Sequence, residues 1–267
     1  MTAPLVRSEV PASDPRQLHV VIDNPTARNG LTHESAAELA RIVERATADP
    51  AVRCIVLRGA GDHFCSGADL RGSMTMVSGG PDAMRRGLSE GFHLALRTIF
   101  ECPKPTLAVI RGACVGFGFD LALAVDLRVS ADEASFGQVF TKIGLVPDGG
   151  SSFTLPRLVG LGKAMEIMLL ADRFGGAEAA RIGLVNRSVP GPELDALAEE
   201  WARRLADGPP IAYRLGKANL RAGAAGGDLA AALHREQEAQ VQCAASKDAI
   251  TAVRAFFMKQ PPVFEGK

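Results

Sequence analysis

Two aspartates in glycine-rich segments of this chain are candidates for acid–base chemistry. Asp120 follows Gly116-Phe-Gly118 within an apolar run, and Asp148 precedes the pair Gly149-Gly150 directly after a proline. Glycine lets the backbone turn tightly and approach a ligand closely. A carboxylate that faces an apolar wall beside several backbone N–H groups is suited to carry a proton. The two acids therefore predict a site whose reaction depends on proton transfer.

Two glycine-containing segments are candidates for N–H donors. In one segment, Gly67 and Ala68 follow a buried apolar run, and in the other two glycines flank Phe117 where a helix is expected to begin. Unpaired N–H groups at a helix start stabilise developing negative charge, because the helix dipole lies behind them. Two such donors converging on one oxygen would form an oxyanion hole. Tight turns also explain glycine clusters, so each segment alone leaves a purely structural role open.

The other reactive side chains in these segments have simpler interpretations. Cys65 and Ser66 lack an evident histidine–acid partnership, so neither is predicted to be a nucleophile. Asp69 and Asp126 are interpreted as structural, with Asp126 expected to accept hydrogen bonds from the backbone. Structural alternatives also exist for the two candidate acids, because Pro-Asp-Gly-Gly favours a turn and an aspartate at a helix start is favoured by the dipole.

Composition excludes several classes of protein. The chain has 267 residues, with 30 basic and 30 acidic side chains, so its charge gives no reason to expect nucleic acid or an anionic membrane surface as a partner. The five cysteines form no CxxC pair, and the five histidines lack metal-ligand spacing. No segment resembles a signal peptide, and no apolar run is long enough to span a bilayer. We expect a cytoplasmic protein that binds no metal, membrane or nucleic acid.

Hydrophobic periodicity predicts an α/β protein. Strands are expected at 18–23, 52–58, 105–110, 126–130 and 185–189, and helices at 32–48, 81–100, 117–124, 149–159 and 163–170. The remainder shows helical periodicity at 192–207, 210–222, 228–243 and 246–258, with a loop expected at 222–227. Strands that alternate with helices favour a wound α/β core over residues 1–190, followed by a helical C-terminal region over residues 191–267.

Ten ordered segments of the chain resemble the crotonase superfamily, also called the enoyl-CoA hydratase/isomerase family. They are Asn24–Leu31, His63–Leu70, Lys104–Gly112, Gly116–Asp126, Ala134–Gln138, Gly144–Gly150, Leu155–Gly160, Ala164–Ala171, Ala177–Asn186 and Ala255–Phe264. The resemblance implies a crotonase-like spiral of ββα units with a helical C-terminal region for oligomerisation and pocket closure. It also implies a homotrimer or hexamer and an acyl-CoA thioester ligand. Coenzyme A would be part of the substrate, so no separate cofactor is expected.

The resemblance also assigns positions in the site. The thioester oxygen would lie between the backbone N–H groups of Ala68 and Phe117. Phe117 departs from the family's usual glycine, so its ring must point away from the thioester or shape the pocket. The segment Met74–Gly80 is expected to form part of the pocket wall. Contacts with CoA are implied for Arg28, Ser66, Ala68, Phe257 and Lys259, the last two from a neighbouring subunit, with a solvated surface arginine as the alternative for Arg28.

The acids at the family's catalytic positions favour isomerisation over hydration. Family hydratases hold a water between two glutamates; here Asp120 stands at the first position and the apolar Phe140, a pocket-wall residue, at the second. Asp148 matches the acid that moves protons along the acyl chain in some family isomerases, and its segment also resembles that of the ring-opening epoxide isomerases. We therefore predict that a proton and a double bond are shifted in an enoyl- or dienoyl-CoA through an enolate, with Asp148 as acid and base and Asp120 assisting.

Three other functions remain open at this point. The chain could be a hydratase with an altered acid set, or a thioester dehalogenase or hydrolase in which Asp148 attacks as a nucleophile. It could also be a CoA-binding homologue that has lost catalysis, a possibility that Phe117 and Phe140 support.

Overall fold

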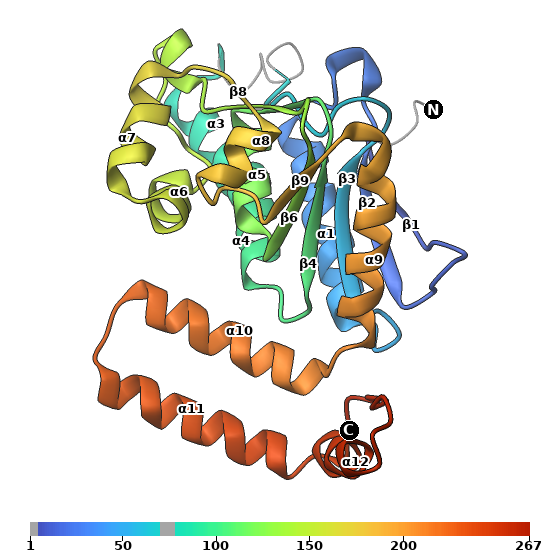
Figure 1. Ribbon diagram of the computed structural model, residues 1–267. Coiled ribbons are helices and arrows are strands. Elements are labelled where there is room, and N and C mark those ends of the chain that lie inside the picture. The colour runs from blue at the N-terminus through green and yellow to red at the C-terminus, as the bar shows by residue number, and fades with distance from the viewer. Residues whose placement is uncertain (1–4, 70–77) are drawn as a thin grey trace.

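The computed structural model describes residues 5–69 and 78–267 (Figure 1). Within these ranges, six strands form a sheet in the order β1–β2–β3–β4–β6–β9, in which only β1 runs antiparallel to its neighbour. A smaller sheet has the order β5–β7–β8. The strands are β1 Val6–Glu9, β2 Gln17–Ile22, β3 Cys54–Gly59, β4 Thr106–Ile110, β5 Ala113–Val115, β6 Leu127–Ala131, β7 Ser135–Gly137, β8 Phe174–Gly175 and β9 Arg187–Val189. Most of the predicted wall segment, residues 74–77, lies outside the described ranges.

Helices cover both faces of the main sheet. Helix α9, Leu194–Asp207, packs on one face against β3, β4 and β6, and α1, His33–Ala48, packs on the other side (Figure 1). Helix α1 begins as the sequence predicts, because a capping box closes its first turn. The Thr32 hydroxyl accepts a hydrogen bond from the Ser35 N–H, and the Ser35 hydroxyl accepts one from the Thr32 N–H. Helices α4, His93–Glu101, and α5, Phe117–Ala124, pack against each other beside α1.

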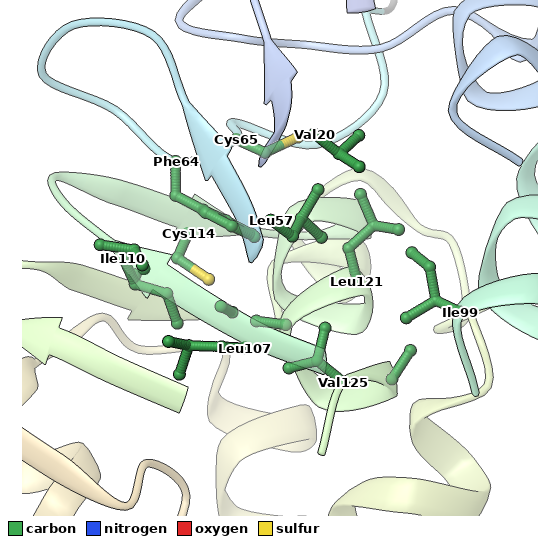
Figure 2. Packing of buried hydrophobic residues seen from close by; sticks show 14 of the residues in the cluster. Val20, Leu57, Phe64, Cys65, Ile99, Leu107, Ile110, Cys114, Leu121 and Val125 are labelled. Carbon is green, nitrogen blue, oxygen red and sulfur yellow. The ribbon is translucent and has the colours of Figure 1, made fainter. Parts of the chain in front are cut away.

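Strands and helix α5 bury a continuous apolar core. All five residues of β4 are buried, and Figure 2 shows Leu107 and Ile110 of this strand close to Leu57 and Leu121. Cys65 and Cys114 lie in the same cluster and are free thiols. Burial raises the pKa of the Cys65 thiol to about 12, so this side chain stays protonated and is a poor nucleophile, in agreement with the interpretation from sequence.

The last three helices extend away from the sheet. Helices α10, Pro210–Ala225, α11, Leu229–Ala244, and α12, Lys247–Phe257, form an arm below the core in Figure 1. Asp126 anchors this arm, because its carboxylate pairs with Lys217 at 2.5 Å and Arg221 at 2.8 Å. The same carboxylate accepts a hydrogen bond from the backbone N–H of Thr106 at 2.8 Å, which confirms the structural role predicted for Asp126.

Local boundaries differ from the prediction in three places. The expected helix 81–100 is divided into α3, Gly80–Gly87, a π-helical turn, Leu88–Phe92, and α4. The expected loop at 222–227 was wrong for residues 222–225, because alanine favours helix and α10 continues to Ala225. Short elements were not predicted, namely β1, β5, β7, β8 and α8, Gly176–Arg181. The helices α6, Ser151–Val159, and α7, Leu161–Leu170, agree with prediction to within two residues.

The described residues contain neither a membrane-spanning helix nor a cluster of metal-ligating side chains. No helix there has the length and apolar character needed to cross a membrane. No group of three or more histidine, cysteine, aspartate or glutamate side chains in the described ranges could hold a metal ion.

Candidate active site

The two glycine-containing segments lie side by side. A Cβ atom at Gly67 would lie 3.1 Å from the Val115 carbonyl oxygen and 3.5 Å from the Phe117 nitrogen, and a Cβ at Gly118 would clash with the Cys65 carbonyl. Gly67 has φ +104°, a conformation that other residues rarely adopt. The two segments are joined by a hydrogen bond from the Val115 N–H to the Cys65 carbonyl at 3.1 Å. Glycine therefore brings the backbone of 65–68 against the start of α5.

Two N–H groups at this junction are candidate donors to a ligand, because neither donates to a main-chain carbonyl of residues 5–69 or 78–267. Phe117 is the first residue of α5, so its N–H has no acceptor within the helix. Ala68 donates no hydrogen bond to a main-chain carbonyl within the described part of the chain. Its neighbours in the same pairing do, because the Leu31 N–H donates to the Gly67 carbonyl and the Asp69 N–H donates to the Leu31 carbonyl. Both residues line a cavity of about 150 Å³. We call it the Ala68 cavity; two donors and a helix start at its wall are suited to bind an oxygen that gains negative charge.

Aromatic rings form much of the Ala68 cavity. The Phe117 side chain is buried and meets Phe92 edge to face, with the ring centroids 4.6 Å apart. Phe92, Phe117 and Phe140 all line the cavity. The benzyl group of Phe117 and the ring of Phe140 are therefore both part of this cavity's wall.

Asp148 separates the Ala68 cavity from a larger one. It lines both, and the larger cavity, of about 360 Å³, is bordered also by Leu96, Arg97, Phe100, Asp120 and Phe153. The backbone of Asp148 is held by His93, whose Nε2–H donates to the Asp148 carbonyl oxygen at 2.8 Å. Burial raises the pKa of the Asp148 carboxyl, and the nearby His93 partly offsets this effect. A half-buried acid with a raised pKa is suited to both accept and return a proton.

Asp120 is more enclosed than Asp148. It is 1% exposed, and its Oδ1 accepts a hydrogen bond from the Gln138 amide at 2.7 Å. Its Oδ2 has no hydrogen-bond partner in the described chain, and the backbone of Gly149 lies so close that a Cβ there would clash with the carboxyl group. Burial raises the pKa of Asp120 to about 7, the hydrogen bond from Gln138 opposes the rise, and the neighbouring Asp148 adds to it. Only Asp148, of the two predicted acids, borders the Ala68 cavity.

We expect the buried Asp120 to make the stability of the fold depend on pH. Its pKa is about 7 in the folded chain against 3.8 for an unperturbed aspartate, so the folded state keeps a proton that the unfolded state releases between these values. This group therefore lowers stability as the pH rises from about 4 to about 7. The difference in unfolding free energy between Asp120→Asn and the native chain is measured by urea denaturation at pH 4 and at pH 8. It should shift in favour of the variant by roughly 2–4 kcal/mol as the pH rises. A difference between the two proteins that is the same at both pH values would contradict this.

The residues predicted to bind CoA are only partly brought together. Ser66 and Ala68 line the Ala68 cavity, but the Ser66 hydroxyl donates to the Ala27 carbonyl at 2.7 Å. Arg28 is exposed on the adjoining turn, where its carbonyl accepts a hydrogen bond from the Ser66 N–H at 3.0 Å. Phe257 and Lys259 are exposed at the end of the C-terminal arm and line neither cavity of this chain. Their role in CoA binding stays a prediction.

Four residues of the site were missed from the sequence. Gln138 donates hydrogen bonds to Asp120 and to Ser151, while Phe92 and His93 reach the site from the π-helical turn and α4. Gln138 lies in the segment Ala134–Gln138 that carries the family resemblance, which was a signal for it. Phe92 and His93 lie inside a long helical pattern that gives no sign of a break.

The chain is similar to known proteins over nearly its whole length. A model of the enoyl-CoA hydratase/isomerase family matches residues 18–267. A Rhodobacter capsulatus protein named "Probable enoyl-CoA hydratase" is 37% identical over 254 residues, which cover 93% of this chain and 94% of that protein. The 1,2-epoxyphenylacetyl-CoA isomerase of Escherichia coli is 30% identical over 248 residues, covering 93% and 94%. The crystal structure of an enoyl-CoA hydratase from Bacillus anthracis superposes with a TM-score of 0.92 at 30% identity, covering 98% of this chain and 100% of that one.

Proposed function

Because the chain belongs to the enoyl-CoA hydratase/isomerase family, we propose that it shifts a proton and a double bond within an enoyl- or dienoyl-CoA thioester. One observation carries the choice of isomerisation. Asp148 is the acid that borders the Ala68 cavity, and the apolar Phe140 is another part of the same wall. A single acid beside two N–H donors is sufficient to move a proton, whereas an aromatic ring cannot hold or activate a water molecule.

The proposed reaction is balanced without a co-reactant. The thioester oxygen accepts hydrogen bonds from the N–H groups of Ala68 and Phe117. The Asp148 carboxylate removes a proton from a carbon of the acyl chain, and the electrons of the broken C–H bond move into the thioester to form an enolate. The N–H donors stabilise the negative charge on the enolate oxygen. The carboxyl group of Asp148 then returns the proton to a different carbon, which shifts the double bond and regenerates the carboxylate.

The two cavities suggest how the acyl group would lie. The thioester would occupy the Ala68 cavity, and an acyl chain that continues past Asp148 would enter the larger cavity. The walls there include Leu96, Phe100 and Phe153, with the rings of Phe100 and Phe153 edge to face at 6.0 Å. Apolar walls of this kind favour hydrocarbon or ring-bearing acyl groups. The similarity to a protein named 1,2-epoxyphenylacetyl-CoA isomerase is the reason to include a ring-bearing thioester in the test.

Hydration is the second candidate function, because the R. capsulatus relative carries the name of a hydratase. In that reaction Asp148 and Asp120 would have to replace the two acids that the family's hydratases use. Asp120 borders the larger cavity and not the Ala68 cavity, where the thioester would lie, and this speaks against the arrangement.

The experiment that tests the proposed function is a panel of CoA thioesters with product analysis by chromatography and mass. The panel contains crotonyl-CoA, 3-hexenoyl-CoA, a 3,5-dienoyl-CoA and a phenyl-bearing enoyl-CoA. We expect 3-hexenoyl-CoA or the dienoyl-CoA to give a product of unchanged mass with a moved double bond. A product heavier by one water would instead identify a hydratase, free CoA a hydrolase, and binding without turnover an inactive homologue.

The proposed assembly is a homotrimer, or a hexamer of two trimers, in which the C-terminal arm packs on a neighbouring copy. Large apolar side chains of the arm are exposed in one chain, including Leu220, Leu229, Phe256 and Phe257. No residue of α10 or α11 is buried by the chain itself. Apolar surface of this extent is typical of an interface between subunits. Sedimentation velocity at micromolar concentration tests the proposal, and a monomer would contradict it.

A further inference from the structure

We propose that Gln138 is a positioning residue, which links Asp120 to the first residue of α6 and thereby fixes the loop that carries Asp148. The inference rests on the proposed function, because it assumes that Asp148 moves the proton. Gln138 follows β7 and is 1% exposed, although a glutamine amide is costly to bury without partners.

The Gln138 amide joins two segments that are distant in sequence. Its Nε2 group donates to Asp120 Oδ1 and to Ser151 Oγ, each at 2.7 Å. Asp120 belongs to α5, the helix whose first N–H is a proposed oxyanion donor, and Ser151 begins α6. One buried side chain therefore sets the distance between the start of α6 and the helix that holds the thioester oxygen.

Asp148 depends on this link because only Gly149 and Gly150 lie between it and Ser151. The loop from Asp148 to Gly150 is held to other elements by the hydrogen bond from His93 to the Asp148 carbonyl and by the close packing of Gly149 on Asp120. Its Gly150 carbonyl accepts hydrogen bonds from the first turn of α6, and that turn is held by the bond from Gln138 to Ser151. Two of these contacts, at Gly149 and at Ser151, therefore involve Gln138 or its partner Asp120. The Asp148 carboxylate itself has no recorded hydrogen bond to another side chain in the described ranges, so its place is set by the loop.

The chemistry of an amide suits this task. A lysine or arginine at position 138 would also bind Asp120, but its positive charge would favour ionisation of both aspartates and weaken Asp148 as a base. A neutral amide holds the carboxyl group of Asp120 and adds no net charge beside Asp148. Gln138 thus fixes the positions of Asp120 and Ser151, whereas the pKa of Asp148 is set by burial, by His93 and by Asp120.

The adjacent serines of α6 provide a matched test. Ser151 is buried and bonded to Gln138, whereas Ser152 is exposed and its side chain makes no hydrogen bond to the part of the chain that the structure describes. The variants Gln138→Met, Ser151→Ala and Ser152→Ala are compared with the native chain on 3-hexenoyl-CoA. For each, kcat, KM and the pH dependence of kcat are measured, with thermal unfolding to confirm the fold.

We expect kcat to fall about 100-fold in Gln138→Met and about 3- to 10-fold in Ser151→Ala, because small displacements of a catalytic group have effects of this size. KM should stay within about 3-fold, since the thioester contacts are made by other residues. The acidic limb of the pH profile should move to lower pH in both variants, because a loosened loop lets water reach the Asp148 carboxylate. Ser152→Ala should match the native chain.

Two results would overturn the inference, and they are distinguishable. If the native chain isomerises the thioester and Ser151→Ala has the same kcat and pH profile as Ser152→Ala, Gln138 does not position Asp148 through α6, whether or not Gln138→Met folds. If the native chain isomerises no thioester of the panel, the proposed function fails and the inference falls with it.

Discussion

Replacement of Asp148 by asparagine should lower the rate of isomerisation by about 100- to 10,000-fold, the range that a single general acid–base group contributes. Asparagine has nearly the same shape and also favours the Pro-Asp-Gly-Gly turn, so the loop before α6 should keep its path. It cannot take up a proton at neutral pH. The expected loss is therefore in kcat, with KM for 3-hexenoyl-CoA changed by less than about 3-fold.

The control for this variant is Asp172→Asn, which changes an exposed carboxylate that borders neither cavity around Asp148. Isomerisation by Asp172→Asn should equal that of the native chain. If Asp148→Asn retained the native kcat while its product was still the shifted isomer, the proposed role of Asp148 would be refuted. If a rapidly quenched native reaction held the acyl group covalently on Asp148, the residue would be a nucleophile rather than a base.

Removal of one oxyanion donor should have the second large effect. Proline at position 117 lacks the N–H and is tolerated at the first position of a helix, which Phe117 occupies in α5. Alanine at the same position loses the same ring contact with Phe92 but keeps the N–H. We expect Phe117→Pro to have a kcat about 100- to 1,000-fold below that of Phe117→Ala, the loss found when one donor of such a site is removed.

The comparison between the two variants tests the donor because both remove the benzyl ring that packs on Phe92, while only proline removes the N–H. Circular dichroism and thermal unfolding of the two proteins establish that α5 still forms. Equal kcat values for Phe117→Pro and Phe117→Ala, with both proteins folded, would show that this N–H does not stabilise the transition state.

Much of the fold follows from local sequence signals. Helix α5 begins and ends where the sequence predicts, because an apolar run starts directly after Gly116 and stops before Asp126. Helix α1 is predicted to within one residue because Thr32 is a capping residue followed by one apolar face. The π-helical turn before His93 was not predictable from periodicity. Gly91 lies there against the backbone of His33, a contact between distant segments.

The candidate site was predictable in its backbone and less so in its side chains. Glycines at 67 and 118 predict a close approach between two segments, and the structure has that approach. The different surroundings of Asp120 and Asp148 were not predictable from the sequence. Both acids lie next to glycines, which follow Asp148 and precede Asp120, so the local sequence does not distinguish them. Burial of Asp120 depends on Gln138 and on the backbone of Gly149, which come from other parts of the chain. Tertiary packing, not local pattern, separates the two acids.

The proposed oxyanion donors are main-chain groups, and this has a consequence for inhibition. Every residue except proline carries the same N–H, so a substitution at position 68 or 117 changes the wall of the Ala68 cavity without removing the donor. An inhibitor that places an anionic oxygen between these two groups would bind atoms that nearly all point mutations leave in place. Resistance to such a compound would have to arise through bulkier or smaller side chains at Phe92 or Phe140, which line the same cavity and would contact the remainder of the inhibitor.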